Sequence, residues 1–214
     1  MTLEDARTEL TDCVEALYRL LRGPAPIGLA VCTAGCCMPQ DMEIQMLGTY
    51  PRNWTEAQVQ EWIAASAADQ LSDKVARFVL PRVLDGLVRG EAISPDGIER
   101  TLERFSAGDP SAWSEREWHF LDRFQRVFLQ VAQDLGVSRL DTALCLFVRG
   151  GWSAEDLFAQ VLEWPDERLI PLLHANSVQD AEHGISRFWP DPSVPKAFFD
   201  SSALKTRLLN AGKT

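Results

Sequence analysis

The sequence predicts an all-helical protein, and three observations support this fold class. Apolar residues recur at intervals of three and four over most of the chain, as they do along one face of an α-helix. Residue pairs that cap helix N-termini precede several of these stretches. No run shows the sustained alternation of apolar and polar residues that a half-buried strand would need. We therefore expect a compact array of about nine to ten helices joined by short links.

The first three helices have clear boundaries. The expected helices, in chain order, span 3–22, 39–47, 55–69, 72–89, 94–105, 114–135, 138–148, 153–163, 165–176 and 196–209. The first helix carries leucine and valine at helical spacing and ends at Gly23. Pro39 and Gly48 bound the second helix. Thr55 and Gln58 form a capping box, in which each side chain satisfies a free backbone N–H of the other, and this box starts the third helix.

The middle of the chain has the strongest helical signals. The fourth helix follows Ser72 and stops at Gly90. The fifth is expected to start at Ser94-Pro95, because proline is tolerated in a first turn. Ser114 and Glu117 make a second capping box before the sixth helix. The sixth helix should be central, because its apolar stripe is the longest in the chain and includes Leu121, Phe124, Phe128, Val131 and Leu135.

The last four helices complete a single domain that covers residues 1–214. Serines precede the helices at 138–148 and 153–163, acidic residues open the one at 165–176, and the stretch PDPSVP separates the final helix from the rest. Residues 190–214 are therefore expected to form an appended C-terminal helix. The phrases FVLPRVLDGL and RLIPLLHAN look alike, so a short HEAT-like superhelix is the alternative architecture, although two copies at irregular spacing do not establish a repeat.

Charge and composition exclude some classes of function. The formal net charge of −10, with no basic stripe to offset it, disfavours binding to nucleic acid. The uncharged stretch between Arg22 and Asp41 is too short and too interrupted by proline and glycine to span a bilayer, and it is expected to form an irregular, buried connection. The N-terminus is too charged for a signal peptide. We expect a cytoplasmic protein that keeps its cysteines reduced and has no membrane partner.

A cysteine cluster is the strongest candidate for chemistry. Three of the five cysteines, Cys32, Cys36 and Cys37, lie within six residues. Thiolates bind soft metals such as zinc or copper and perform redox reactions. The spacing differs from that of zinc fingers, which use two separated ligand pairs. Three methionines that would suit copper(I) follow closely: Met38, Met42 and Met46. The alternative interpretation, which we weight more heavily, is that these cysteines pack as small apolar residues.

Other reactive residues give weaker signals. Cys13 and Cys145 lie beside apolar stripes and are expected to be core residues. His119 lies on a polar face, and His174 and His183 lie near predicted helix ends. No nucleophile elbow, phosphate loop, dinucleotide fingerprint or zinc-protease motif occurs. The sequence therefore has no recognisable catalytic constellation and favours a protein that is not an enzyme.

Seven tryptophans are many for 214 residues. They either anchor the packing of helices or, if several are exposed together, mark a surface for a partner. The seven are Trp54, Trp62, Trp113, Trp118, Trp152, Trp164 and Trp189.

The N-terminal part resembles a known family. The segment Gly35-Cys36-Cys37-Met38, followed by a short helix and then by the step Leu80-Pro81-Arg82, is similar to a family of uncharacterised bacterial proteins that have a glycine-and-cysteine cluster before a Leu-Pro-Arg helix. The resemblance covers about the first ninety residues, and the cysteine spacing departs from the family's pattern. It implies a bacterial, cytosolic origin and attaches no activity.

Two functional hypotheses follow. The first is a helical interaction or scaffold protein that binds a protein partner, such as a second copy in a homodimer, or a small ligand. The alternative is a metal-binding or thiol-redox protein that uses the cysteine cluster of Cys32, Cys36 and Cys37.

Overall fold

The computed structural model describes residues 2–32, 37–66, 69–178 and 185–211 of the chain. Within these ranges the protein is all-helical, as predicted, and its only β-type pairing is an isolated bridge between Val31 and Ser66. The described part contains ten α-helices: α1 (Leu3–Leu20), α2 (Gln40–Leu47), α3 (Glu56–Ala65), α4 (Asp73–Arg89), α5 (Glu115–Val131), α6 (Leu140–Arg149), α7 (Ala154–Leu162), α8 (Asp166–Val178), α9 (Ser193–Phe199) and α10 (Ser202–Ala211). Short 3₁₀ helices lie at η1 (Pro51–Asn53), η2 (Ile98–Arg100), η3 (Pro110–Ala112) and η4 (Gln133–Leu135).

The predicted helix starts are confirmed where the caps were strongest. Thr55 accepts a hydrogen bond from the backbone N–H of Gln58, whose side chain accepts one from Thr55 in return. Ser114 and Glu117 form the same reciprocal pair at the start of α5. Gly90 ends α4 in the left-handed conformation, at φ 68°. These local contacts satisfy backbone groups that a helix end leaves open.

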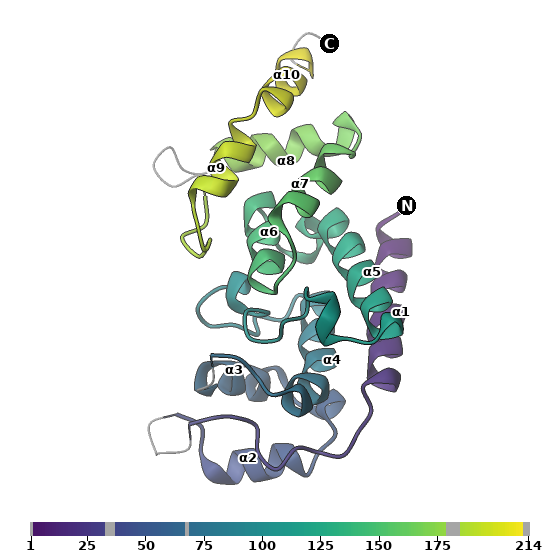
Figure 1. Cartoon of the computed structure of the whole chain (residues 1–214), viewed down its shortest axis with the longest axis vertical. Coiled ribbons are helices and arrows are strands. Elements are labelled where there is room, and N and C mark those ends of the chain that lie inside the picture. Colours follow the sequence, from purple (N-terminus) through teal and green to yellow (C-terminus); the bar gives the residue numbers. More distant parts are fainter. Residues whose placement is uncertain (1, 33–36, 67–68, 179–184, 212–214) are drawn as a thin grey trace.

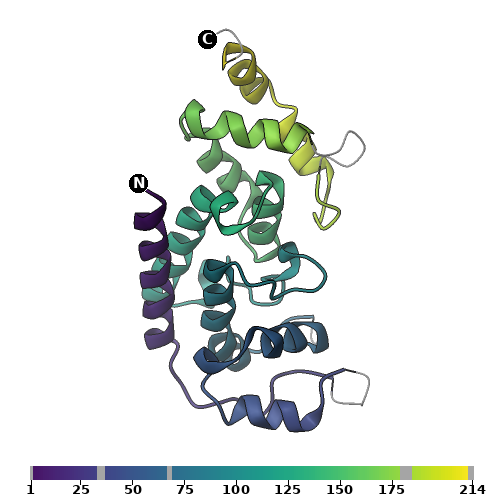
Figure 2. The same ribbon diagram turned by 180° about the vertical axis from the view of Figure 1, so that it is seen from behind.

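The helices form successive layers along the long axis of the molecule (Figure 1). α2 lies at one end, α3 and α4 come next, α6 and α7 follow, and α8, α9 and α10 form the other end (Figures 1 and 2). α1 lies along the side of this stack and packs against α5 and α4. No helix in the described ranges is long and apolar enough to cross a membrane.

An aromatic cluster ties α5 to α6 at the centre of the stack. The rings of Phe128 and Phe147 meet edge to face with their centroids 5.6 Å apart, and Phe147 meets Trp152 at 5.2 Å. Phe124 stacks on Phe128 at 5.7 Å. The complete predicted stripe of α5 and η4 is buried, which confirms the central position of this segment. Each such side chain contributes about 1.5–3 kcal/mol through burial.

Three expected elements differ from the structure. Residues 94–105 contain only η2 and a run of turns, because Gly97 adopts φ 121°, which an α-helix cannot accommodate. The sixth expected helix ends at Val131 and continues as η4. The appended C-terminal helix is two helices, α9 and α10. The first ends at Asp200, and the hydroxyl of Ser201 then accepts a hydrogen bond from the backbone N–H of Leu204 at the start of the second.

The connection after α1 is less buried than expected. Residues 22–25 are exposed, and Ile27 is completely exposed. Leu29 and Met38 are fully buried and hold the two sides of the connection against the core. Met46 is also fully buried and Met42 packs against the core, so these methionines serve as packing residues.

Candidate functional site

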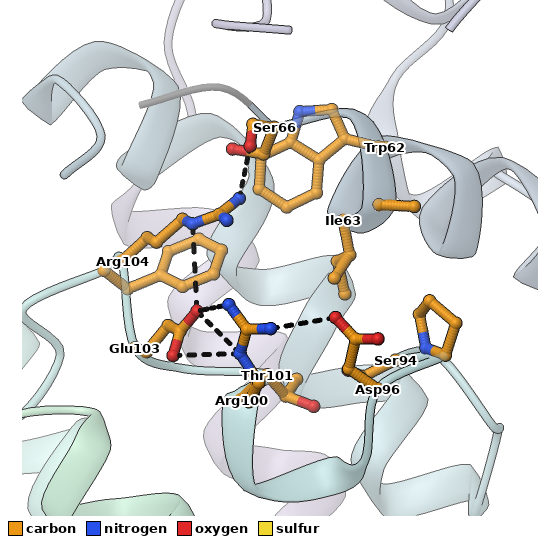
Figure 3. Close-up of a pocket in the computed structure, with 12 residues that line it drawn as sticks. Trp62, Ile63, Ser66, Ser94, Asp96, Arg100, Thr101, Glu103 and Arg104 are labelled. Atoms are coloured by element: carbon orange, nitrogen blue, oxygen red, sulfur yellow. Dashed lines mark hydrogen bonds and ion pairs between the residues drawn. The ribbon is translucent and has the colours of Figure 1, made fainter. Parts of the chain in front are cut away.

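A pocket lies between the C-terminal end of α3 and the irregular segment 94–105 (Figure 3). Its volume is about 150 Å³, and it opens to solvent. The lining residues include the aromatic rings of Trp62 and Phe105, the aliphatic Ile63, and the charged side chains of Arg100 and Arg104. The irregular segment 94–105 forms one side of the pocket, and the end of α3 forms the other.

The aromatic wall of the pocket is held firmly. The indole N–H of Trp62 donates a hydrogen bond to the carbonyl of Leu29 at 3.0 Å, and the Trp62 side chain is buried. The rings of Trp62 and Phe105 lie 5.9 Å apart between centroids. The backbone N–H of Leu71 donates to the carbonyl of Arg104 at 3.1 Å, which fixes the backbone immediately before Phe105. The wall is therefore preformed.

Three arginines surround one carboxylate at the charged side of the pocket, and we call Arg100, Arg104 and Arg149 with Glu103 the arginine cluster. Arg100 donates from Nη2 to Oε1 of Glu103 at 2.8 Å. Arg149 donates from Nε to Oε2 of Glu103 at 2.8 Å. Arg104 is further away, with its Nε 4.0 Å from Oε1 of Glu103. Asp96 pairs with Nη1 of Arg100 at 2.9 Å.

Figure 3 shows Asp96, Arg100, Glu103 and Arg104 along one side of the pocket. Burial alone would raise the pKa of Glu103, but the hydrogen bonds from Arg100 and Arg149 outweigh it and hold the pKa below its usual value. The carboxylate is therefore ionised at neutral pH.

Two buried acidic residues, Asp141 and Glu99, connect the same region to the C-terminal layer. Ser186 donates its backbone N–H to Asp141 at 2.6 Å and its hydroxyl to Glu99 at 2.7 Å. Burial raises the pKa of Asp141, even though Ser186 and Arg139 donate hydrogen bonds to it. Arg149 donates from Nη1 to the carbonyl of Phe188 at 2.8 Å. These contacts fasten the segment before α9 to α6 and η2.

Three hydroxyls at the pocket have unused hydrogen-bonding capacity. The side-chain oxygens of Ser66, Ser94 and Thr101 are buried beneath the pocket surface and have no hydrogen-bond partner among the residues that the structure describes. Ser66 and Thr101 are 7% and 3% exposed. An unpaired buried hydroxyl costs about 1–3 kcal/mol. The pocket thus keeps polar groups at an energetic cost.

Replacing Thr101 with valine will stabilise the protein by about 1 kcal/mol, because the substitution keeps the shape and removes an unpaired polar group. Urea denaturation measures the change. The matched control is Thr55→Val, which removes a capping hydroxyl and is expected to cost about 1 kcal/mol. Equal destabilisation by the two substitutions would contradict the unpaired state of Thr101.

Replacing Glu103 with glutamine will destabilise the protein at pH 7 by about 2 kcal/mol, since two charge-assisted hydrogen bonds weaken. The folded-state pKa of Glu103 is lowered, so its contribution is present above the unfolded pKa of about 4.3 and is lost as the pH falls through the folded value. The difference between wild type and E103Q should therefore close in acid. Denaturation at pH 7 and in steps below pH about 4 tests this, with exposed Glu163→Gln as control. A gap that stays constant with pH would refute it.

The cysteine cluster is only partly described. Cys32 is half-buried, and its backbone N–H donates to the carbonyl of Ala65 at 2.9 Å. Cys37 is exposed, and Cys36 lies outside the described residues. Among the side chains that the structure describes, no three histidine, cysteine, aspartate or glutamate residues are grouped as metal ligands. A zinc or copper site at Cys32, Cys36 and Cys37 stays a prediction.

The remaining thiols and imidazoles are placed as follows. Cys13 and Cys145 are buried, and burial raises their pKa to about 11 and about 12, so both thiols stay protonated at neutral pH. His119 is exposed on α5, and His174 is exposed on α8. His183 lies outside the described ranges.

The tryptophans are core residues rather than a surface patch. Trp118 is half-buried and stacks on Trp152 at 6.1 Å. The other six are at most 8% exposed: Trp54, Trp62, Trp113, Trp152, Trp164 and Trp189. They anchor the packing of helices, which removes one of the two interpretations that the sequence left open.

The arginine cluster was missed in the sequence because 94–105 was interpreted as a regular helix. On such a helix Arg100, Glu103 and Arg104 would form an ordinary solvated face. The spacing of Arg100 and Glu103 is a recognisable ion-pair signal. No local pattern brings in Arg149, which lies 46 residues from Glu103 in the sequence.

Comparisons with known proteins found no matching family model, no matching curated protein and no matching solved structure.

Proposed function

We propose that this chain is a helical binding protein that takes a small organic ligand, about one ring in size, in the pocket between α3 and segment 94–105. The observation that carries the proposal is the composition of the pocket: a fixed aromatic wall and two arginines surround one opening, and three unpaired hydroxyls lie buried beneath its surface. Ligand sites combine apolar walls with a few placed polar groups in this way.

The size of the pocket limits the ligand. A cavity of about 150 Å³ accommodates a benzene ring. The hydroxyls of Ser66, Ser94 and Thr101 would gain partners if a ligand moved the neighbouring side chains slightly. This gain would offset part of the cost of ordering the ligand.

The sequence predicts either a protein partner or a small ligand, and the proposal selects the small ligand. The burial of six tryptophans takes away the aromatic surface that a protein partner would use. The bacterial and cytoplasmic setting inferred from the sequence is part of the proposal.

The test uses three single-ring probes, benzoate, benzamide and benzylamine, with the full chain. Binding is followed by saturation-transfer NMR and by chemical shifts of the Trp62 indole and the Ser66 and Thr101 amides. Replacing Ile63, which lines the pocket, with tryptophan should fill it and abolish binding. Ile44→Trp on α2 makes the same change at a position that is 63% exposed, and it should leave binding intact.

Binding of at least one probe that is lost in I63W and kept in I44W supports the proposal. The absence of binding for all three probes at millimolar concentration would overturn it, and so would equal binding by both variants.

A further inference from the structure

We infer that the ligand is a small carboxylic acid, bound as its anion, whose apolar ring lies against Trp62 and Phe105 while its carboxylate pairs with Arg104. This inference rests on the proposed function and adds the chemical class of the ligand.

The two carboxylates that line the pocket compensate its arginines unequally. Arg100 and Arg104 supply two positive charges to the lining, and Asp96 and Glu103 supply two negative ones. Arg149, which does not line the pocket, also bonds Glu103 and competes with Arg104 for that carboxylate. The side chain of Asp96 is also 65% exposed, so solvent screens its contribution more than that of Glu103, which is 12% exposed. A ligand with one negative charge would therefore meet positive charge that these two carboxylates compensate only in part.

Arg104 is the arginine with the least compensation by anions. Its Nη1 donates to a neutral acceptor, the carbonyl of Ser66, at 2.7 Å. Its Nε lies 4.0 Å from Glu103, whereas Arg100 and Arg149 both bond Glu103 at 2.8 Å. A guanidinium has five N–H groups arranged to receive a carboxylate on one edge. Figure 3 shows Arg104 at the side of the pocket, between Ser66 and Glu103.

The rest of the pocket selects an apolar body. Trp62, Ile63, Pro95 and Phe105 give the wall that faces the charges its apolar character. The ring of a benzoate-sized molecule matches a volume of about 150 Å³. Inorganic phosphate carries between one and two charges at neutral pH and has no apolar part, so it would leave this wall in water. A ring with an ammonium group would be repelled by Arg104.

Isothermal titration calorimetry at pH 7 with benzoate, benzamide and benzylamine separates these cases, because the three share a ring and differ in charge. We expect benzoate to bind about tenfold or more tightly than benzamide, as a charge-assisted pair requires, and benzylamine to bind most weakly. Arg104→Gln should lower benzoate affinity by about tenfold and leave benzamide affinity unchanged.

The matched control is Arg126→Gln, which removes the same charge from an exposed arginine on α5 that pairs with Asp122. It should leave the preference for benzoate intact. If R104Q does not fold, as judged by circular dichroism, Arg104→Lys keeps the charge and should retain the preference for benzoate over benzamide. A tenfold loss of benzoate binding on raising the salt concentration, with benzamide unaffected, is expected in the wild type.

Failure of the carboxylate assignment can be distinguished from failure of the proposed function. If benzamide binds as tightly as benzoate, or R126Q weakens benzoate as much as R104Q, the carboxylate assignment is wrong and the proposed function stands. Phosphate that binds as tightly as benzoate and displaces it would also overturn the assignment. If none of the three ring compounds binds, both proposals fail.

Discussion

Replacing Arg82 with methionine will lower the free energy of unfolding by about 3–5 kcal/mol, a large part of the stability of a domain of this size. Arg82 is only 1% exposed, within the apolar face of α4. Its Nε donates to the carbonyl of Trp54 at 3.0 Å, and its Nη1 lies 2.8 Å from Oε2 of Glu91. Methionine would fill the space but would remove the nearer counter-charge of a mostly buried carboxylate, which would keep only Arg89, with its Nη1 3.9 Å from Oε1 of Glu91.

Urea denaturation of R82M measures this effect, and two further variants serve as controls. Arg89→Met on the same helix removes an arginine that is 56% exposed, pairs with Asp85 and lies 3.9 Å from Glu91, so it should cost less than about 1 kcal/mol. The double variant R82M/E91L removes both charges and should recover much of the loss. If R82M costs no more than R89M, the buried pair does not contribute as the structure indicates.

Replacing Gly108 with alanine will destabilise the protein by about 3 kcal/mol or more, because there is no room for a side chain. A Cβ atom at this position would lie 2.1 Å from the backbone nitrogen of Trp152 and 2.4 Å from the carbonyl carbon of Gly151. The backbone N–H of Gly108 also donates to the carbonyl of Gly150 at 2.8 Å. Since the obstacle is backbone rather than a flexible side chain, the chain at residue 108 must move away from residues 151–152.

Gly136→Ala is the matched control for this experiment. Gly136 has φ 90°, and an added Cβ would meet nothing within 4 Å. Alanine there costs only the strain of the left-handed conformation, about 1–2 kcal/mol. Thermal and urea denaturation compare the two variants. Similar losses in both would mean that the close approach of residues 108 and 151–152 does not persist in solution.

Local signals predicted much of the fold. The capping boxes at Thr55 and Ser114 and the apolar stripe of α5 depend on residues three or four positions apart, so the sequence displays them directly. The prediction of a helix at 94–105 was wrong because Gly97 adopts a positive φ. The helix-start signal at Ser94-Pro95 does not reveal this backbone conformation. The turns of this segment are stabilised by partners far away in the chain, such as Ser186, which donates to Glu99.

The candidate site depended almost wholly on such distant contacts. The pocket joins residues 62–66 at the end of α3 to residues 94–105, which lie 28 or more positions later. The incomplete compensation of Arg104 becomes visible only when Arg149 is placed beside Glu103. Conversely, the cysteines that the sequence singled out as the most reactive feature lie on the connection that precedes α2, and the structure describes only two of the three.

The shared carboxylate of Glu103 has a consequence for how the protein unfolds. Through it, Arg100 at the pocket is connected to Arg149 at the end of α6, and Arg149 in turn holds the backbone of Phe188 before α9. Stacked helical layers often open one at a time, each with its own free energy. Here a partial opening of the C-terminal layer would expose Arg149 and disturb a carboxylate that the pocket also uses. Layers on either side of α6 should therefore open cooperatively rather than independently.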